Sequence, residues 1–328
     1  MKKTNILIAG GAGYIGSHMV RDLLNAGYGV ITLDNLSTGH RNSVTGGTFI
    51  KGDLRKKTVL NKVFSNHHID AVMHFAAYSL VRESVEDPLK YYQNNMGGTA
   101  ELLGAMVRHE VEHFIFSSTA SVYGEPAETP ITEEHPCKPG NPYGASKYAT
   151  EELLKACDTA YGIKYVSLRY FNAAGADVSG EIGEMHDPET HLIPLILLTA
   201  MGQQNYINIF GTDYLTQDGT CVRDYVHVSD LTQAHMLALE SLLSGAESDI
   251  YNVGNSRGYS VREVIELARK ITGLPIPIIE TEKRPGDPAM LIASSEKIRK
   301  ALKWKPRYEE LETIIRTAWG WHRRDTER

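Results

Sequence analysis

The sequence predicts an α/β protein, in which a doubly wound parallel sheet is followed by a smaller mixed α/β domain. In the first half of the chain, short apolar segments alternate with amphipathic helix patterns, and this rhythm breaks after about Asn172. Strand–helix alternation is typical of a parallel sheet covered by helices on both faces. We therefore expect a first domain at residues 1–173 and a second at 174–328, with the chain able to cross back into the first.

Six apolar segments of the first half are predicted strands. Runs such as NILIA are apolar at consecutive positions after the first residue, as expected for strands buried on both sides. The clearest helix is Ser17–Asn25, with one apolar face. The predicted strands are Asn5–Ala9, Val30–Asp34, Thr48–Gly52, Ala71–Ala76, His113–Ser117 and Lys164–Tyr170.

The second half has a different organisation. Ser260 and Glu263 form a capping-box pattern, which predicts a helix that ends at Gly273. The C-terminal segment Trp321–Arg328 is interpreted as a solvated helix end. A loop, a helix and a strand are predicted at Ala176–His191, Ile193–Met201 and Ile207–Phe210.

Composition excludes several classes of protein. The net charge of −6 is not the basic charge typical of nucleic-acid-binding proteins, and no stretch approaches the ~18 apolar residues of a membrane span. We therefore expect neither nucleic acid nor a membrane as a partner. Met1–Thr4 runs directly into an apolar strand and leaves no room for a signal peptide. The 3 cysteines are widely spaced and form neither a disulfide framework nor a metal motif. These observations favour a cytoplasmic protein.

A glycine-rich loop follows the first strand. Gly10, Gly13 and Gly16 have the spacing G-x-x-G-x-x-G and open a helix, which is the context that makes such a spacing informative. The first two glycines allow a tight turn close to a pyrophosphate, and the third allows close helix–strand packing. The helix N-terminus at Tyr14 and Ile15 then offers N–H groups to phosphates. The alternative is a purely structural glycine turn.

Asp34 ends the second predicted strand, 18 residues beyond Gly16. A carboxylate at this place can accept hydrogen bonds from both ribose hydroxyls of an adenosine, whereas it would repel a 2′-phosphate. The pattern therefore predicts a Rossmann-type domain that binds NAD rather than NADP.

Tyr143 and Lys147 lie one helical turn apart in GNPYGASKYATEEL. The chain has 17 tyrosines, and this is its only Tyr-x-x-x-Lys, but about one such match is expected by chance. Context comes from FIFSSTASVYG, a buried strand that ends in hydroxyl residues including Ser117 and Thr119. With the glycine loop, this set resembles the extended short-chain dehydrogenase/reductase family over nearly the whole chain.

The resemblance implies that Thr119, Tyr143 and Lys147 are catalytic. The chemistry explains these residue types, because using a tyrosine with a pKa near 10 as a base at pH 7 costs about 4 kcal/mol. A lysine cation and an oxidised nicotinamide nearby lower this cost. Thr119 would then hydrogen-bond the substrate hydroxyl and relay its proton.

Two positions distinguish among the activities of the family. Dehydratases that act on nucleotide sugars carry an Asp-Glu pair directly after the strand-end threonine, where this chain has Ala120 and Ser121. The chain resembles instead the UDP-hexose 4-epimerase branch, enzymes of galactose metabolism. This implies reversible, NAD-dependent 4-epimerisation of UDP-glucose and UDP-galactose through a 4-keto intermediate. The alternatives are a UDP-sugar decarboxylase or reductase, and a non-catalytic NAD-sensing module.

The same resemblance implies two sets of binding residues and assigns NAD to residues 1–173 and the UDP-sugar to 174–328. The residues expected to bind NAD are Gly10, Gly13, Tyr14, Ile15, Gly16, Asp34, Asn35, Ser37, Thr38, Gly39, Asp53, Leu54, Phe75, Ala76, Ala77, Asn94, Ser117, Tyr143, Lys147 and Phe171. Those expected to bind the UDP-sugar are Thr119, Tyr143, Asn172, His191, Leu192, Phe210, Arg223, Arg284, Asp287 and Leu291.

Two residues depart from the pattern of some epimerases. Ser79 stands where some members place a lysine against the cofactor, and His191 stands where some place an asparagine. The segment His186–His191 brings acidic and imidazole groups together, but no established ligand spacing fits and Pro188 breaks a helical face. We therefore expect a substrate-side loop and no metal site.

Leu291 is expected to border the sugar pocket. By resemblance, a tyrosine at this position restricts epimerases to plain glucose and galactose, and a smaller residue admits an N-acetyl group at C2. Leu291 therefore predicts activity on UDP-N-acetylglucosamine as well, unless it is only a core residue. The resemblance also implies a homodimer formed through the helices near Leu89–Val107 and Ser146–Ala160.

Overall fold

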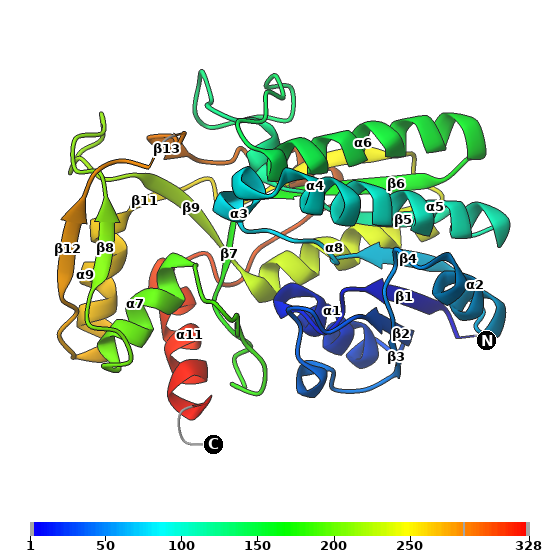
Figure 1. Ribbon diagram of the computed structural model, residues 1–328, viewed down its shortest axis with the longest axis horizontal. Helices are drawn as coiled ribbons and strands as arrows, with labels where there is room; N and C mark the ends of the chain where they lie inside the picture. The colour runs from blue at the N-terminus through cyan, green and yellow to red at the C-terminus, as the bar shows by residue number, and fades with distance from the viewer. Residues whose placement is uncertain (1–2, 285, 326–328) are drawn as a thin grey trace. The chain divides into compact units, whose positions relative to one another are not determined.

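The computed structural model describes residues 3–284 and 286–325 and divides into two compact units (Figure 1). The chain enters the second unit three times and returns to the first twice. The first unit comprises Met1–Gly124, Pro136–Arg169 and Thr232–Tyr251. The second comprises Glu125–His135, Tyr170–Leu231 and Asn252–Arg328.

The first unit is built on a seven-stranded sheet of order β10-β6-β5-β4-β1-β2-β3, whose strands from β6 to β3 are parallel. The order reverses between β1 and β4, and such a switch point leaves room for a ligand outside the carboxyl ends of the strands. The strands are β1 (Asn5–Ala9), β2 (Gly29–Asp34), β3 (Thr48–Lys51), β4 (Ala71–His74), β5 (His113–Ser117), β6 (Lys164–Tyr170) and β10 (Asp249–Val253).

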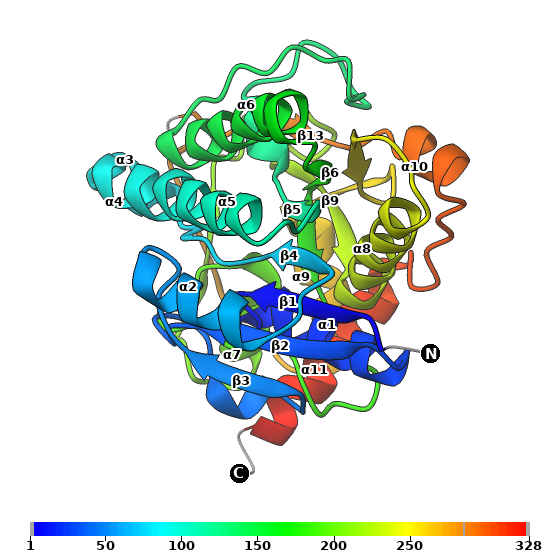
Figure 2. The same cartoon turned by 90° about the vertical axis from the view of Figure 1, so that its right-hand side faces the viewer.

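Helices cover both faces of this sheet, with α2, α5 and α6 on one face and α1 and α8 on the other (Figures 1 and 2). Alternate strand residues face alternate sides, so Leu7 and Leu33 join the core beneath the first group of helices, with Leu60 and Leu102. The doubly wound parallel fold is thus confirmed. The helices and short turns of helix are α1 (Tyr14–Asn25), η1 (Arg41–Ser43), α2 (Lys57–Asn66), α3 (Val81–Glu86), α4 (Pro88–Tyr91), η2 (Tyr92–Gly97), α5 (Gly98–Arg108), η3 (Ala120–Val122), α6 (Pro142–Tyr161) and α8 (Val228–Leu243).

The second unit is a smaller mixed structure. One sheet has the order β11-β9-β13, with β7 also pairing with β9, and β8 pairs with β12 in another. Helices α7, α9 and α11 contribute to one apolar core with β8 and β9. The elements are β7 (Asn172–Ala174), α7 (Leu192–Ala200), β8 (Ile207–Phe210), β9 (Val222–His227), β11 (Gly258–Ser260), α9 (Val261–Thr272), β12 (Ile278–Thr281), β13 (Met290–Leu291), α10 (Glu296–Ala301) and α11 (Leu311–Asp325).

Most predicted elements are found within a few residues of the expected bounds. The capping box of Ser260 and Glu263 is formed, and Gly273 ends α9 in the left-handed conformation. One interpretation is wrong: the C-terminal segment is not simply solvated, because Trp321 and His322 are buried. Within the described part of the chain, no helix has the length and apolarity needed to cross a membrane.

Candidate active site

The glycine loop turns sharply where β1 ends. Gly10 has φ +85°, and a Cβ there would lie 2.4 Å from the backbone nitrogen of Ala76, so only glycine fits. A Cβ on Gly16 would lie 2.1 Å from the Gly10 carbonyl oxygen. Gly13 is the N-cap of α1, and no side chain caps this helix. Tyr14 and Ile15 follow as the first residues of α1. The backbone therefore offers the cradle and helix N-terminus that a pyrophosphate requires.

The Asp34 carboxylate is hydrogen-bonded to the backbone of this loop. Its Oδ2 accepts the N–H of Ala12 at 2.9 Å, and its Oδ1 accepts the N–H of Leu36 at 2.8 Å. The following segment folds back over the loop, since a Cβ on Gly39 would lie 2.7 Å from the carbonyl carbon of Ala12. Within that segment, the Asn35 Oδ1 accepts the Ser37 N–H at 2.9 Å. These contacts bring two groups of predicted NAD residues, distant in sequence, to one place.

Asp53 has a partner that the sequence did not indicate. The Arg55 guanidinium donates to both of its carboxylate oxygens, at 3.0 Å from Nε to Oδ1 and 2.5 Å from Nη2 to Oδ2. Hydrogen bonding from Arg55 holds the pKa of the Asp53 carboxyl below its usual range. Asp53 is thus held as a carboxylate, next to the buried Leu54.

The loop after β4 also reaches the glycine turn. The N–H groups of Phe75 and Ala76 both donate to the carbonyl oxygen of Ala9, at 2.7 and 3.0 Å. The Phe75 ring packs against His235 with 4.9 Å between centroids. Elsewhere in this unit, the Asn94 amide donates to Asn95 Oδ1 at 3.0 Å.

Thr119 lies just beyond the end of β5 and is buried. As the N-cap of η3, its Oγ1 accepts the N–H of Ser121 at 3.1 Å. Its hydroxyl also acts on the Tyr143 phenol and lowers the pKa of that phenol. The predicted threonine and tyrosine therefore lie close together.

Tyr143 is the second residue of α6, whose N-cap is Asn141. The helix starts close to the strand end, because a Cβ on Gly144 would lie 2.4 Å from the carbonyl oxygen of Ser121. Burial raises the pKa of the Tyr143 phenol, and the Thr119 hydroxyl offsets this only in part. Without ligands, the phenol is held in its neutral form.

Lys147 lies one turn further along α6 and is only 3% exposed. Its Nζ donates to the carbonyl oxygen of Ser117 at 2.7 Å and lies 4.8 Å from the centre of the Phe116 ring. Burial lowers the pKa of this ammonium to about 7, although the charge of Glu151 acts in the opposite direction. In the described residues, no hydrogen bond joins Lys147 to Tyr143, so any effect of this cation on the phenol acts through space.

A buried polar network that the sequence did not reveal supports α6. Ser118 donates to Glu151 at 2.5 Å, and the Arg169 guanidinium binds the same carboxylate, with its Nε 3.0 Å from Oε1. Arg169 also donates to the Tyr123 hydroxyl at 3.0 Å. These contacts hold the helix of Tyr143 against the ends of β5 and β6, since a fully hydrogen-bonded buried pair fixes the geometry around it.

In the second unit, the strand register places Arg223 of β9 directly beside Leu291 of β13. The Arg223 Nη2 lies 2.5 Å from Oδ1 of Asp287. The Asn172 amide at the start of β7 donates to the backbone oxygen of Asp224 at 2.8 Å. Four of the predicted UDP-sugar residues therefore lie on or next to one strand, while Phe171, just before β7, is buried.

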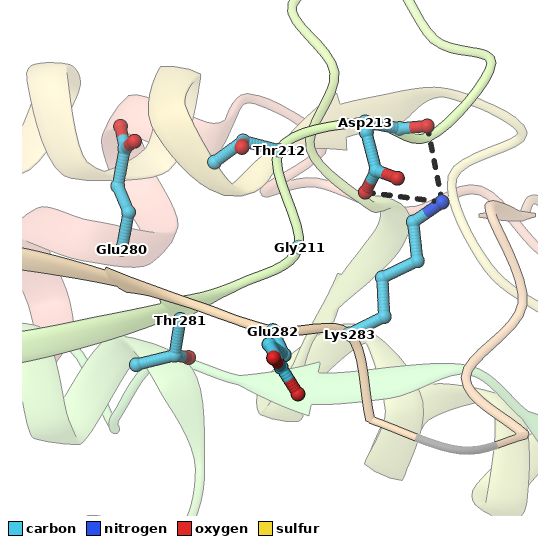
Figure 3. Close-up of a pocket in the computed structure, with 7 residues that line it drawn as sticks. All are labelled: Gly211, Thr212, Asp213, Glu280, Thr281, Glu282 and Lys283. Atoms are coloured by element: carbon cyan, nitrogen blue, oxygen red, sulfur yellow. Dashed lines mark hydrogen bonds and ion pairs between the residues drawn. The ribbon is translucent and has the colours of Figure 1, made fainter.

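Arg284 and Phe210 form another part of this unit. The guanidinium carbon of Arg284 lies 3.6 Å from the centre of the Phe210 ring. Beside Phe210 is an open pocket of about 700 Å³, lined by residues 211–213 and 280–283. Figure 3 shows Lys283 reaching Asp213, with its Nζ 3.1 Å from Oδ1 and 3.0 Å from the backbone oxygen. Six of its seven lining residues are polar or charged, and it adjoins the predicted substrate residues without containing them.

His191 and Leu192 lie where α7 begins, with His191 as its N-cap. The His191 Nδ1 is 2.5 Å from Oε1 of Glu184, a buried residue that the sequence interpretation did not single out. Glu184 lies seven positions before His191 in a loop, and no periodic pattern marks such a pairing.

Comparison with known proteins gives a consistent result. Residues 6–254 match the model of the NAD dependent epimerase/dehydratase family. The chain belongs to this family.

Relatives within the family are close over their full length. A UDP-glucose 4-epimerase of Halalkalibacterium halodurans is 54% identical over 318 residues, covering 97% of this chain and 95% of the relative. The structure of UDP-glucose 4-epimerase from Brucella ovis in complex with NAD is 45% identical with a TM-score of 0.94, over 97% of this chain and 98% of the neighbour. The UDP-Glc/GlcNAc 4-epimerase of Campylobacter jejuni is 40% identical with a TM-score of 0.86, over 98% of this chain and 99% of the neighbour.

Membership in the epimerase/dehydratase family confirms the resemblance to extended short-chain dehydrogenases and the prediction of NAD as the cofactor. The glycine cradle and the Asp34 carboxylate fit this cofactor, because they match the pyrophosphate and an unphosphorylated ribose. The roles of the individual residues stay predictions.

Proposed function

We propose that the protein is a UDP-glucose 4-epimerase, which interconverts UDP-glucose and UDP-galactose through a 4-keto sugar. The observation that carries this proposal is the closeness of Thr119 to Tyr143, one turn from the buried Lys147. Ala120 and Ser121 follow the threonine and provide no acid–base pair for elimination. Relatives that share about half of their residues with this chain carry the same name, which favours epimerisation over decarboxylation, reduction or NAD sensing.

Tyr143 is the base in this proposal. It removes the proton from the sugar 4-hydroxyl, and Thr119 hydrogen-bonds that hydroxyl and relays its proton. Lys147 stabilises the phenolate by its charge. When bound, NAD supplies reversible hydride chemistry at C4 of the sugar. The raised pKa of Tyr143 in the free chain means that the phenol depends on these added charges to ionise near neutral pH.

The chain's residues hold the cofactor by backbone and carboxylate contacts. Gly10, Gly13 and the start of α1 bind the pyrophosphate, and Asp34 binds the adenosine ribose. Asp53, kept ionised by Arg55, lies near the adenine in this proposal. Ser79 replaces a lysine that some relatives direct at the cofactor, so we expect NAD to be retained differently here.

The second unit binds the nucleotide. Arg223 and Arg284 bind the diphosphate, since planar guanidinium groups bind pairs of oxygens, and Asp287 binds the uridine ribose. Asn172 and His191 complete the diphosphate contacts. Firm binding of UDP with few contacts to the hexose lets the 4-keto sugar turn, which is necessary for hydride return to its opposite face.

The test is incubation of the protein with UDP-galactose, with UDP-glucose assayed and no NAD added. An epimerase converts the substrate by using the NAD it retains. A reductase or decarboxylase gives a different product, and a sensing module gives none even when NAD is then added. Either of the last two results overturns the proposal.

Leu291 extends the proposed substrate range to UDP-N-acetylglucosamine. Its place beside Arg223 puts it next to a predicted diphosphate ligand rather than deep in a separate core. A UDP-Glc/GlcNAc 4-epimerase is among the structural neighbours.

Exposed apolar side chains support a homodimer. Val85 and Leu89 are 63% and 69% exposed, and Val81, Tyr92 and Val107 are also exposed along α3 to α5. A run of such residues over adjacent helices favours burial against a second copy. We also propose a cytoplasmic location, because Cys137, Cys157 and Cys221 are free thiols, which are typical of a reducing compartment.

A further inference from the structure

The loop between β7 and α7 gathers four side chains with metal-binding atoms. One ligand atom from each of Glu184, His186, Glu189 and His191 lies within 4.8 Å of all the others. We propose that these four residues form a binding site for one divalent transition-metal ion of the zinc class. This site lies wholly in the second unit; it shares His191 with the proposed diphosphate contacts and is separate from the chemistry assigned to Tyr143.

The distances suit a tetrahedral ion. Both imidazoles direct Nδ1 toward the carboxylates: His186 Nδ1 lies 3.2 Å from Glu184 Oε1 and 3.6 Å from Glu189 Oε2. His191 Nδ1 lies 2.5 Å from Glu184 and 3.6 Å from Glu189. Zinc bonds to nitrogen and oxygen of about 2.0–2.2 Å place tetrahedral ligands about 3.3–3.6 Å apart. The His191–Glu184 distance is the shortest of these and must widen by about 1 Å to admit an ion.

The nitrogen and oxygen atoms of these four side chains determine which metal ions the site can bind. Two imidazoles and two carboxylates suit zinc and its neighbours in the transition series, whereas calcium and magnesium prefer oxygen ligands alone. Pro188 does not count against the site, because residues 184–191 form a loop and the ligands need no common helical face. The expectation of no metal rested on the absence of an established ligand spacing and on Pro188 breaking a helical face, and it did not include Glu184.

The surrounding structure holds the carboxylates in place. The backbone oxygen of Glu184 accepts the Trp321 Nε1–H of α11 at 2.9 Å, and a Cβ on Gly183 would lie 2.3 Å from the Trp321 ring. Glu189 Oε1 accepts the N–H groups of Thr190 and His191 at 2.7 and 2.9 Å. From α11, Arg324 donates to the backbone oxygen of Ser179 in the same loop. Such outer contacts orient metal ligands before the ion arrives.

The imidazole side of the cluster is the side nearer to solvent. The Glu184 and Glu189 side chains are 3% and 8% exposed, whereas those of His186 and His191 are 26% and 46% exposed. An ion would therefore approach the buried carboxylates from the side of the two histidines.

The experiment is titration of the EDTA-treated full chain with zinc chloride by calorimetry. We expect one ion per chain with micromolar or tighter affinity, with magnesium chloride giving no comparable binding. His186→Gln and Glu189→Gln should each weaken binding by more than about tenfold. Neither residue has a role in the proposed epimerase chemistry, so both variants report on the metal site alone.

The matched control is His68→Gln. His68 also lies beside a carboxylate, with its Nε2 3.0 Å from Asp70 Oδ1, and it should not change zinc affinity. Circular dichroism verifies that each variant is folded, and if one is not, the other decides. Absence of zinc binding, or zinc affinity unchanged in the folded cluster variants, overturns the proposal. A failed epimerase assay with intact zinc binding would instead overturn only the proposed function.

Discussion

The Lys147 ammonium donates a hydrogen bond to the backbone oxygen of Ser117, 2.7 Å away. This bond fixes a buried cation at the end of β5, one helical turn from Tyr143. Burial moves the two groups in opposite directions, lowering the pKa of Lys147 and raising that of Tyr143. The free chain therefore holds a weakened cation beside a neutral phenol, and ionisation of the phenol depends on charge brought by the cofactor.

Lys147→Met is expected to reduce turnover by at least about a hundredfold, because it removes the charge that stabilises the phenolate. It also changes how stability depends on pH. The folded-state pKa of Lys147 is about 7, below the ordinary value of 10.5, so between these values the unfolded chain binds the extra proton. The wild type should therefore gain free energy of unfolding relative to the variant as pH rises from 7 to 10. Urea unfolding of NAD-free protein across this range measures it, and a difference that stays constant contradicts the assignment of a buried cation.

Tyr143→Phe should lower turnover by about a hundredfold or more while leaving NAD binding and folding nearly intact. The ring still packs at the start of α6, and only the hydroxyl that lies near Thr119 is lost. Tyr148→Phe on the same helix is the matched control and should keep full activity. Turnover above about a tenth of wild type in the Tyr143 variant would exclude it as the main base.

Glu151→Ala is expected to destabilise the first unit by about 3 kcal/mol or more, because it leaves the guanidinium of Arg169 buried without its carboxylate. Glu152 makes an exposed pair with Lys155, so Glu152→Ala should cost less than about 1 kcal/mol. Denaturant unfolding of both variants measures the difference. Equal effects would mean that the buried network does not support α6.

Asp34→Ala should weaken NAD binding, and adding an arginine at the exposed Ser37 should admit NADP. The structure adds that this substitution removes the acceptor for the N–H groups of Ala12 and Leu36, so some loss of stability accompanies the change. Fluorescence titration with both cofactors measures the preference. A wild-type protein that already prefers NADP would refute this role of Asp34.

The sequence predicted the strands and helices that are formed by residues adjacent in the chain. The strands Asn5–Ala9, His113–Ser117 and Lys164–Tyr170 were predicted with the observed bounds, because each is a short segment rich in apolar and aromatic residues. Helix α1 begins at Tyr14, three residues earlier than predicted, because the glycine turn itself starts the helix. Strand β10 was missed, since its DIYNV sequence is short and partly polar.

The parts of the site that the sequence did not reveal join residues far apart in the chain. Arg169 and Glu151 are 18 residues apart and come from a strand and a helix, so no spacing rule relates them. The Glu184–His191 contact forms in a loop, where side-chain direction has no fixed period. Such contacts depend on tertiary structure, which neither hydrophobic period nor local propensity encodes.

The last prediction concerns Leu291. Its strand, β13, pairs with β9 so that Leu291 lies beside Arg223, which in turn binds Asp287. Two of these residues are proposed to bind the nucleotide, so a larger side chain at Leu291 would occupy space next to the bound substrate. A steric gate discriminates by clash, and an N-acetyl group at C2 needs more space than a hydroxyl.

Leu291→Tyr should therefore depress turnover of UDP-N-acetylglucosamine by at least about tenfold more than turnover of UDP-glucose, since a clash with one substrate alone changes the ratio of the two rates. Met290→Tyr is the matched control, because successive strand residues point to opposite faces and this neighbour is directed away from Leu291. It should change both rates alike. The measurement is kcat/KM for both substrates in the wild type and the two variants. If the wild type does not turn over the N-acetylated sugar, or if Leu291→Tyr lowers both rates equally, the gate is refuted while the proposed epimerase activity stands.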